Sequence, residues 1–268
     1  MKDIAKIVTI AALLVSGVAM AKTDVNSATP ESKTSISKEK MIDMAGRQRM
    51  LSQRVAKDYF YLGKKINKGN AKKQLDATLR EFKKTQDILS KNIKDEEISN
   101  LIAFVNMSLD EFNAVATDKY SIDNGTIILD LSESMLEGSD YVVQALKKGK
   151  ETNAIIDIAG KQRMLSQRIA KYYIAYQAGI KDDNTITQMR ETVKEFDDAL
   201  NKLLANKENT KEIQDELNKV NKMWKIVYKF YLNIEKGGLP IIVFTTTDDI
   251  TKNMNKIVKM YVEILEKK

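Results

Sequence analysis

One segment of about twenty residues occurs twice in this 268-residue chain, and it constrains the fold more than any other feature. Residues 42–61 read IDMAGRQRMLSQRVAKDYFY and residues 156–175 read IDIAGKQRMLSQRIAKYYIA, so 14 of 20 positions are identical at an offset of 114. Fainter matches follow downstream: Glu81-Phe82 with Glu195-Phe196 at the same offset, and Val105-Asn106 with Val220-Asn221 at an offset of 115. A repeat of about 115 residues has the size of a small domain and is far longer than a solenoid unit.

Each repeat divides into four stretches of helical character. The chain has only 2 prolines and 11 glycines, and this composition favours long helices. The expected helices span residues 37–66, 71–92, 96–116 and 126–148 in the first module (37–149), and residues 151–178, 185–206, 211–235 and 241–266 in the second (150–268). Four helices of this length joined by short loops make an antiparallel four-helix bundle. The sequence therefore predicts an all-α protein of two tandem four-helix-bundle modules.

Two local details refine this prediction. Asp95 and Thr210 precede helical stretches with acidic residues in the first turn, so we expect them to be N-caps. Residues 241–247 are rich in β-branched side chains and have strand propensity. Their repeat partner near residues 126–131 favours a helix instead, and we expect one.

The N-terminus has the pattern of a secretory signal peptide. Lys2 and Lys6 precede the apolar run 7–20, and the segment ends on Ala19-Met20-Ala21, which fits a small-x-small cleavage site. The run is short for a membrane span of about 20 apolar residues, although a retained anchor is the alternative. Because no second long apolar stretch follows, we expect cleavage after Ala21 and a soluble periplasmic protein. Residues 22–36 are polar, and we expect a flexible leader.

The residue types that are missing restrict the chemistry. The chain has no histidine and no cysteine, which excludes disulfides, thiolate chemistry and imidazole metal ligands. The commonest general base is absent as well, so we expect no enzyme, no cofactor and no metal site, although carboxylate-only chemistry stays open. The formal net charge is +7, but the basic residues are interspersed with acidic ones. A nucleic-acid binder shows a concentrated basic stripe, so no nucleic-acid partner is expected.

The repeated segment forms three faces on a helical wheel. The face expected in the bundle core consists of Met41, Met44, Gln48, Leu51, Val55, Tyr59 and Leu62. The face expected toward solvent consists of Asp43, Arg47, Arg54, Lys57 and Asp58. Asp43 and Arg47 have the spacing of an i,i+4 ion pair, and Asp157 and Lys161 repeat it.

The third face carries one arginine among small residues. Its members are Ile42, Ala45, Gly46, Arg49, Ser52, Gln53 and Ala56, and in the second repeat Ile156, Ala159, Gly160, Arg163, Ser166, Gln167 and Ala170. Small residues let another helix approach closely, and a guanidinium buried in this way needs a partner because it cannot lose its charge. Two interpretations stay open. Arg49 and Arg163 face each other and clamp a small planar oxyanion with serine and glutamine donors, or they pair with acidic residues or cap carbonyls at a helix crossing.

The pattern Ala-Gly-x-x-Arg-Met-x-Ser-x-Arg on a first long helix resembles the type IV pili methyl-accepting chemotaxis transducer N-terminal domain family, also called PilJ-type or NarX-like. The resemblance covers both halves of the chain and implies periplasmic four-helix sensor domains. In the nitrate/nitrite sensor kinases of this type, nitrate lies between two first helices at a dimer interface, held by one motif arginine from each subunit. The resemblance thus implies that Arg49 and Arg163 hold the ligand, with Gly46 and Gly160 as the motif glycines.

Two motifs in one chain raise the question of how they are combined. The chain can supply both motif helices to one composite site as an intramolecular pseudo-dimer, or place its bundles end to end and need a homodimer. We expect a sensory protein that binds nitrate or nitrite and reports to a membrane receptor or chemotaxis protein. The alternative is a helical interaction module that packs on a receptor, pilus or chemotaxis component without a small ligand. The contacts of the two arginines discriminate between these functions.

Overall fold

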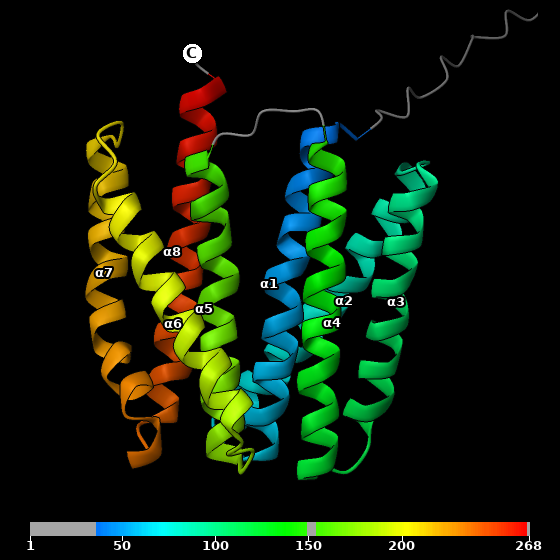
Figure 1. Cartoon of the computed structure of the whole chain (residues 1–268), viewed down its shortest axis with the longest axis vertical. Helices are drawn as coiled ribbons and strands as arrows, with labels where there is room; N and C mark the ends of the chain where they lie inside the picture. The colour runs from blue at the N-terminus through cyan, green and yellow to red at the C-terminus, as the bar shows by residue number, and fades with distance from the viewer. Residues whose placement is uncertain (1–35, 149–153, 267–268) are drawn as a thin grey trace, which may run out of the picture. The chain divides into compact units, whose positions relative to one another are not determined.

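The computed structural model describes residues 36–148 and 154–266, and Figure 1 shows that this part of the chain is all helical, without a strand. The helices are α1 (Lys38–Gly63), α2 (Lys68–Asn92), α3 (Glu96–Thr117), α4 (Ile122–Lys147), α5 (Ala154–Ala178), α6 (Asp183–Leu204), α7 (Lys211–Leu232), the 3-10 turn η1 (Ile234–Lys236) and α8 (Pro240–Glu266). The predicted all-α class is confirmed. The predicted signal peptide (1–21), the leader up to residue 35 and the module boundary at residue 149 lie outside the described residues.

Short side chains fix where the helices begin. The backbone N–H of Ile98 donates to Asp95 at 3.0 Å, and that of Ile213 donates to Thr210 at 3.3 Å. Each cap satisfies one of the N–H groups that the first turn of a helix leaves free, and both predicted N-caps are confirmed. Residues 241–247 lie inside α8, so the helix expected there is also confirmed.

The eight helices pack as two rings of four within one compact unit. In the first ring α1 and α3 each pack against α2 and α4, and in the second α5 and α7 each pack against α6 and α8. The rings meet where α1 packs on α5. Figure 1 shows both of these helices running from the top of the view to the bottom, so they are parallel. The two motif helices therefore lie side by side, as in an intramolecular pseudo-dimer.

Equivalent residues build the two cores. Leu51 and Leu165 are fully buried, as are Phe82 and Phe196, and each such side chain contributes about 1.5–3 kcal/mol of burial free energy. A buried glutamine of each motif helix fastens it to the next helix: Gln48 donates to the carbonyl of Phe82 at 3.0 Å and Gln162 donates to that of Phe196 at 2.9 Å. These glutamines do not reach the arginines.

Across the described ranges, none of the helices is both long enough and apolar enough to cross a membrane. The same residues contain no cluster of three or more acidic side chains arranged to hold a metal ion.

Candidate functional site

Helix α1 holds Arg49 at its boundary with α4. The side chain is 8% exposed, its Nη1 donates to Asp140 Oδ1 of α4 at 2.7 Å, and its Nε lies 3.4 Å from the carbonyl oxygen of Gly46. A Cβ at Gly46 would lie 3.4 Å from Nη2 of Arg49. The motif glycine thus leaves room for the guanidinium to fold back along its own helix.

Helix α5 holds Arg163 in the same way but with a neutral partner. The side chain is 7% exposed, its Nε donates to the carbonyl of Gly160 at 3.2 Å, and its Nη1 donates to Asn255 Oδ1 of α8 at 3.0 Å. Asn255 occupies the position that Asp140 occupies in the first repeat, at an offset of 115. The second arginine therefore has an amide partner where the first has a carboxylate.

The two arginines share one electrostatic environment across the α1–α5 contact. Burial lowers the pKa of Arg163, and the positive charges of Arg47 and Arg49 lower it further, while Asp43 opposes them. Asp43 is an exposed residue of α1 whose Oδ1 lies 3.8 Å from Nη2 of Arg163. Within the described residues, Nη2 of Arg49 and Nη2 of Arg163 make no hydrogen bond of normal length. Nη2 of Arg163 is thus turned toward the carboxylate of Asp43, and Nη2 of Arg49 can take a further acceptor.

The motif serines and glutamines are buried, and their donors are engaged inside the bundles. Ser52 donates to the carbonyl of Arg49 at 2.9 Å, and Ser166 makes the equivalent bond to Arg163 at 3.0 Å. Gln53 Nε2 donates to the carbonyl of Ser132 on α4 at 2.9 Å, and Gln167 Nε2 donates to Thr251 Oγ1 on α8 at 2.8 Å. The glutamine bonds tie each motif helix to the fourth helix of its own ring. To donate to a ligand, these serines and glutamines would have to give up their present hydrogen bonds.

The prediction that Lys57 and Asp58 face solvent is wrong, since both side chains are completely buried. Lys57 Nζ donates to Asp248 Oδ1 of α8 at 2.8 Å and to Gln74 Oε1 of α2 at 2.8 Å. The physical reason is that the second ring, not water, covers this face of α1. A helical wheel gives the direction of a side chain but not what lies there.

The contact between the rings contains two equivalent ion pairs, in each of which a lysine of one repeat pairs with an acidic residue of the other. Lys57 of the first repeat reaches Asp248 of the second, and the equivalent Lys171 of the second repeat pairs with Glu133 of the first. Such an exchange is the signature of a two-fold contact. Burial raises the pKa of Glu133, but the positive charges of Lys171 and Arg168 together outweigh this effect and lower the pKa to about 2. Opposite charges at equivalent positions of both repeats were the sequence signal for this contact, and our sequence analysis missed it.

Two further predicted ion pairs are also wrong. Arg47 pairs with Glu81 of α2 instead of Asp43, and Lys161 pairs with Glu195 of α6 at 2.5 Å instead of Asp157. A neighbouring helix offers an acceptor that stabilises the rings, whereas a pair along one helix gains only about 0.3–0.5 kcal/mol. Asp43 is left beside Arg163, which places a carboxylate of the first repeat next to the arginine of the second.

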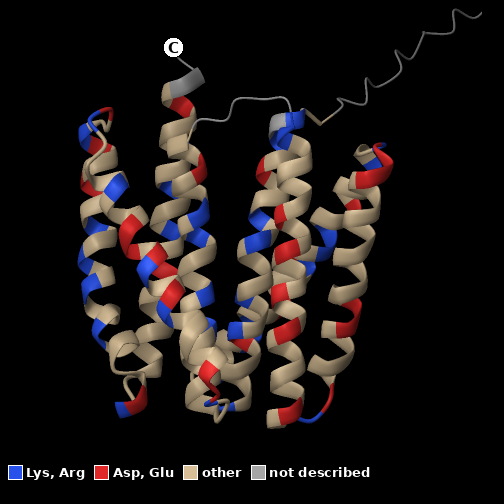
Figure 2. Ribbon diagram, in the orientation of Figure 1, with Lys and Arg blue, Asp and Glu red and all other residues tan. Residues whose placement is uncertain are grey.

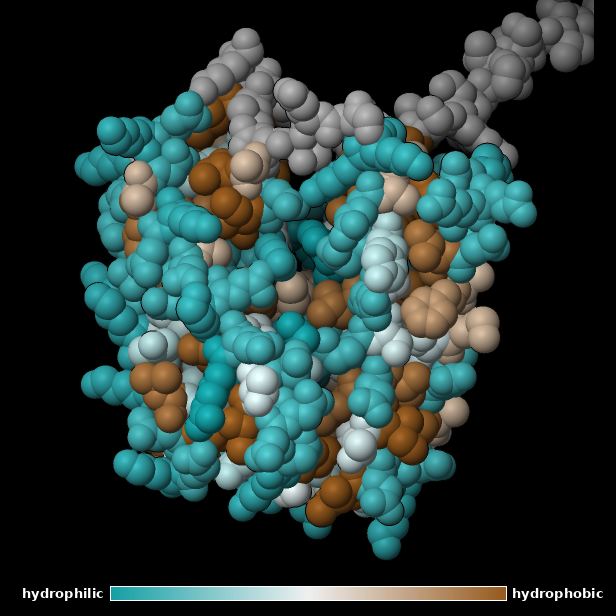
Figure 3. Space-filling view, in the orientation of Figure 1, coloured by the Kyte–Doolittle hydropathy of each residue, from teal (hydrophilic) through white to brown (hydrophobic). Residues whose placement is uncertain are grey.

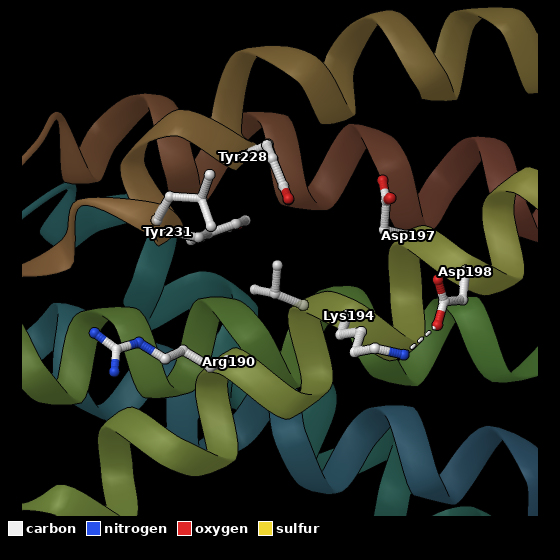
Figure 4. A pocket seen from close by; sticks show the side chains of 8 residues that line it. Arg190, Lys194, Asp197, Asp198, Tyr228 and Tyr231 are labelled. Atoms are coloured by element: carbon white, nitrogen blue, oxygen red, sulfur yellow. Dashed lines mark hydrogen bonds and ion pairs between the residues drawn. The ribbon is translucent and has the colours of Figure 1, made fainter.

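A separate open pocket of about 170 Å³ lies between α6 and α7 (Figure 4). Its lining consists of Arg190, Val193, Lys194, Asp197, Asp198, Tyr228, Tyr231 and Leu232. Several of the charges are already paired, since Lys194 donates to Asp198 at 2.8 Å and Asp197 accepts from the buried Trp224 at 2.7 Å. The pocket contains none of the motif residues, so we do not place the ligand site there.

Comparison with known families gives one clear match. The sequence model of the family described as "Type IV pili methyl-accepting chemotaxis transducer N-term", PilJ, matches residues 32–96 and 145–234, more than half of the chain. The chain belongs to this family. The two matched segments contain α1 and α5 respectively, so the predicted tandem copies of the PilJ domain are confirmed. No curated protein and no solved structure matches the chain.

The PilJ family consists of N-terminal sensory domains of chemotaxis transducers, so both repeats are domains of a sensory type. The matched segments contain both motif arginines but not their partners on α4 and α8. Asp140 and Asn255 are therefore features of this chain that the family match does not describe, and they are what makes the two arginines different.

Proposed function

We propose that this PilJ-family protein is a periplasmic sensory protein that binds a small oxyanion between α1 and α5 and reports to a membrane receptor. Nitrate and nitrite are the leading candidates. The observation that carries the proposal is the pair of buried arginines, Arg49 and Arg163, one from each repeat, whose charges act on each other across the α1–α5 contact. No catalytic role, cofactor or metal is part of the proposal.

The chemistry of the pair favours a small planar anion. Guanidinium groups cannot be neutralised, and each hydrogen bond from one of them to an anion contributes about 1.5–3 kcal/mol. An anion between Arg49 and Arg163 would also remove their mutual repulsion. Since the carboxylate of Asp140 lies 2.7 Å from Arg49, while the nearest carboxylate to Arg163 is that of Asp43 at 3.8 Å, we expect Arg163 to contribute more to affinity.

Binding at this place would have a mechanical consequence. The anion would favour the arrangement in which α1 and α5 hold their arginines together, and a ligand shifts an equilibrium by its differential affinity for the two states. The ends of the parallel motif helices would carry that shift to a receptor. Gly46 and Gly160 contribute by leaving the arginines room to turn.

Calorimetric titration of residues 22–268 with nitrate and nitrite at low ionic strength tests the proposal, with chloride and sulfate as controls. We expect one site per chain and loss of binding in Arg163→Ala. Arg190→Ala is the matched control, because that arginine is exposed and pairs with Glu235 at 3.3 Å. If none of the anions binds, or if Arg163→Ala binds as the unaltered chain does, the composite oxyanion site is refuted.

The ion pair between Arg49 and Asp140 supports a second function. An arginine that is already satisfied by a carboxylate fits a helical interaction module, which packs on a receptor, pilus or chemotaxis component without a small ligand. The absence of anion binding in the same titration would favour this alternative.

Export is also part of the proposal. Cleavage after Ala21 leaves a mature chain that begins at Lys22. Sequencing the N-terminus of the protein from a periplasmic fraction checks it, and a start at Met1 would argue for a retained anchor.

A further inference from the structure

Exposed large apolar side chains gather at one end of the helical bundle. Leu239 is 54% exposed, Ile241 55% and Ile242 37%, and all three lie where α8 begins. The exposed Ile122, which begins α4, and the exposed Leu232, which ends α7, lie at the same lower end of Figure 1. Hydrophobic surface reaches this end in Figure 3. At the opposite end, where α1 begins and α8 ends, the described residues expose no large apolar side chain.

The turn between α7 and α8 (residues 233–239) is fixed on two other helices. The hydroxyl of Tyr61 on α1 donates to the carbonyl of Pro240 at 2.7 Å, and the Tyr61 ring lies edge-on to Phe244 with 4.7 Å between the centroids. Gln177 of α5 donates to the carbonyl of Ile234 at 2.9 Å. The apolar side chains are therefore exposed on a backbone that is held in place. The bond from Tyr61 also puts the loop after α1 beside this turn.

The loop after α1 and the turn after α7 together carry a concentration of positive charge. Residues 64–68 and 229–242 contain a single acidic residue, Glu235, which pairs with Arg190 at 3.3 Å. Their lysines are all exposed and pair with no acidic side chain of the described ranges. These lysines and the apolar side chains beside them, which we call the lysine–isoleucine edge, are Lys64, Lys65, Lys68, Lys229, Lys236, Leu239, Ile241 and Ile242.

The equivalent edge of the molecule has neither property. It consists of the α3–α4 and α5–α6 loops, which meet where a Cβ at Gly179 would lie 3.1 Å from Ile122. Residues 118–123 and 178–183 contain four aspartates and two lysines, and Figure 2 shows both signs of charge at this end of the bundle. At an offset of 115, Leu239 and Ile241 correspond to Asn124 and Thr126. The ring therefore folds with polar side chains at these two places, and its packing does not require apolar ones.

Two lysines of the edge occupy positions that disfavour lysine. Lys65 has a φ of +57°, and at the equivalent position Gly179 has a φ of +117°. Left-handed positions at the end of a helix favour glycine, which has no Cβ. Lys68 begins α2, where the positive end of the helix dipole opposes its charge, whereas Asp182 and Asp183 stand at the equivalent start of α6. The loop would be more stable without these lysines, which indicates that their charge serves a contact outside the fold.

We infer that the lysine–isoleucine edge binds the surface of an anionic lipid bilayer. The exposed leucine and isoleucines enter the boundary between headgroups and acyl chains, while the lysines meet lipid phosphates. A bilayer takes up single side chains without a fitted groove, which suits residues exposed on a turn. The edge contains none of the motif residues, so this contact does not depend on anion binding at Arg49 and Arg163.

A second copy of the chain is a poorer partner for this edge. The aspartates of the equivalent edge already serve the ends of their own helices. Asp182 accepts from the backbone N–H of Thr185 at 2.7 Å and from its hydroxyl at 3.0 Å, and Asp123 lies in the first turn of α4. That edge also has polar residues where Leu239 and Ile241 would need apolar partners. Association between copies is therefore an outcome that the tests must separate from lipid binding.

Co-sedimentation of residues 22–268 with lipid vesicles tests the inference. This form contains the whole helical unit and lacks the apolar run 7–20, which would bind lipid by itself. We expect binding to vesicles of equal parts phosphatidylcholine and phosphatidylglycerol, and at least tenfold weaker binding to phosphatidylcholine alone. Added salt should weaken the binding, because the lysines are exposed. No binding to the anionic vesicles, or equal binding to both kinds, would overturn the inference.

The first repeat supplies a variant of the turn that the fold accepts. Leu239→Asn with Ile241→Thr introduces the residues of the equivalent edge and should weaken vesicle binding at least tenfold with unchanged circular dichroism. Met107→Asn with Tyr141→Thr is the matched control, since both side chains are exposed and lie away from this end. Equal binding by the two variants would mean that the apolar side chains do not enter the bilayer, and would overturn the inference.

The second repeat supplies a variant of the loop. Lys64→Ala, Lys65→Gly and Lys68→Asp together introduce the residues found at an offset of 114. This variant should resist urea better than the unaltered chain and still bind anionic vesicles at least tenfold more weakly. Unchanged vesicle binding would overturn the inference. Self-association in sedimentation velocity that this variant abolishes, without any vesicle binding by the unaltered chain, would identify a contact between copies and would overturn it as well.

The absence of cysteine from the chain allows a direct test of insertion. Ile241→Cys carries a single environment-sensitive dye, and we expect its emission to move to shorter wavelength when anionic vesicles are added. Met107→Cys with the same dye is the control and should not respond. No shift at Ile241→Cys, or the same shift at both positions, would overturn the inference.

Discussion

The first and second repeats agree where they touch each other and differ where each stands alone. At their junction both use a buried lysine and an acid of the other repeat, Lys57 with Asp248 and Lys171 with Glu133. Away from it, Asp140 is matched by Asn255, Gly138 by Asn253 and the exposed Phe104 by Lys219. A two-fold contact needs the same residues twice, whereas a surface or a single binding partner does not. At the motif arginines, this difference gives Arg49 a carboxylate partner and Arg163 an amide partner.

The largest expected effect on stability comes from removing the acidic residue of one of the two ion pairs between the rings. Glu133→Ala leaves the buried Lys171 and the half-buried Arg168 without a carboxylate, and removing one partner of a buried pair costs about 3–5 kcal/mol. We expect the free energy of unfolding in urea to fall by about that amount. Glu137→Ala, on the exposed side of the same helix, should change it by less than about 0.5 kcal/mol. Equal losses in the two variants would contradict a stabilising role for the exchange.

The pH dependence of stability should differ between Asp58 and Glu133. Burial raises the pKa of Asp58 to about 7, its oxygens accept no hydrogen bond from the described residues, and Lys57 Nζ is 3.5 Å away. The folded state therefore holds this proton more tightly than the unfolded chain, and stability falls as pH rises from about 4 to 7. The slope is at most about 1.4 kcal/mol per pH unit.

Asp58→Asn should remove this slope, which urea unfolding at several pH values measures. Glu133 has the opposite sign, because its lowered pKa gives stability that is present above pH 4.5 and is lost as the pH falls toward 2. A chain whose stability between pH 4 and 7 is the same with and without Asp58 would contradict the raised pKa.

A third prediction concerns the closeness of α3 and α4. A Cβ at Gly138 would lie 2.6 Å from Val105 Cγ2, although the equivalent position of the second repeat is Asn253. We expect Gly138→Asn to cost about 1–3 kcal/mol of unfolding free energy, because overpacking forces the helices apart. Gly69→Ala is the control, since nothing lies within 4 Å and alanine favours the helix. A neutral Gly138→Asn would mean that both rings pack their third and fourth helices alike.

The smallest expected effect tests the asymmetry of the arginines. Asn255→Asp gives Arg163 the carboxylate that Arg49 already has, and this carboxylate competes with a bound anion. We expect nitrate affinity to fall about tenfold, or about 1.4 kcal/mol, with little change in stability. Asp140→Asn makes the reverse change and should raise the affinity. Calorimetric titration of both variants with nitrate measures these affinities. An equal change of affinity in the same direction in both variants would contradict the proposed difference between Arg49 and Arg163.

Local signals predicted the helices well because they act within a few residues. Asp95 and Thr210 cap the helices that follow them, and residues 241–247 are helical as the repeat indicated. The motif also gave the correct family and placed both arginines on one buried face. The wheel failed at Lys57 and Asp58, since it assumed that a face with charged residues meets water.

The sequence by itself determined the all-α class, the eight helices and the doubling of the PilJ domain, because helix periodicity, capping and self-similarity are local properties of the chain. Only the tertiary structure decided that α1 packs on α5 and that Lys57 meets Asp248. It also decided that Arg49 and Arg163 have different partners, Asp140 and Asn255. These contacts join residues about 90 to 190 positions apart. Their partners are chosen by the packing of whole helices, which no short segment encodes.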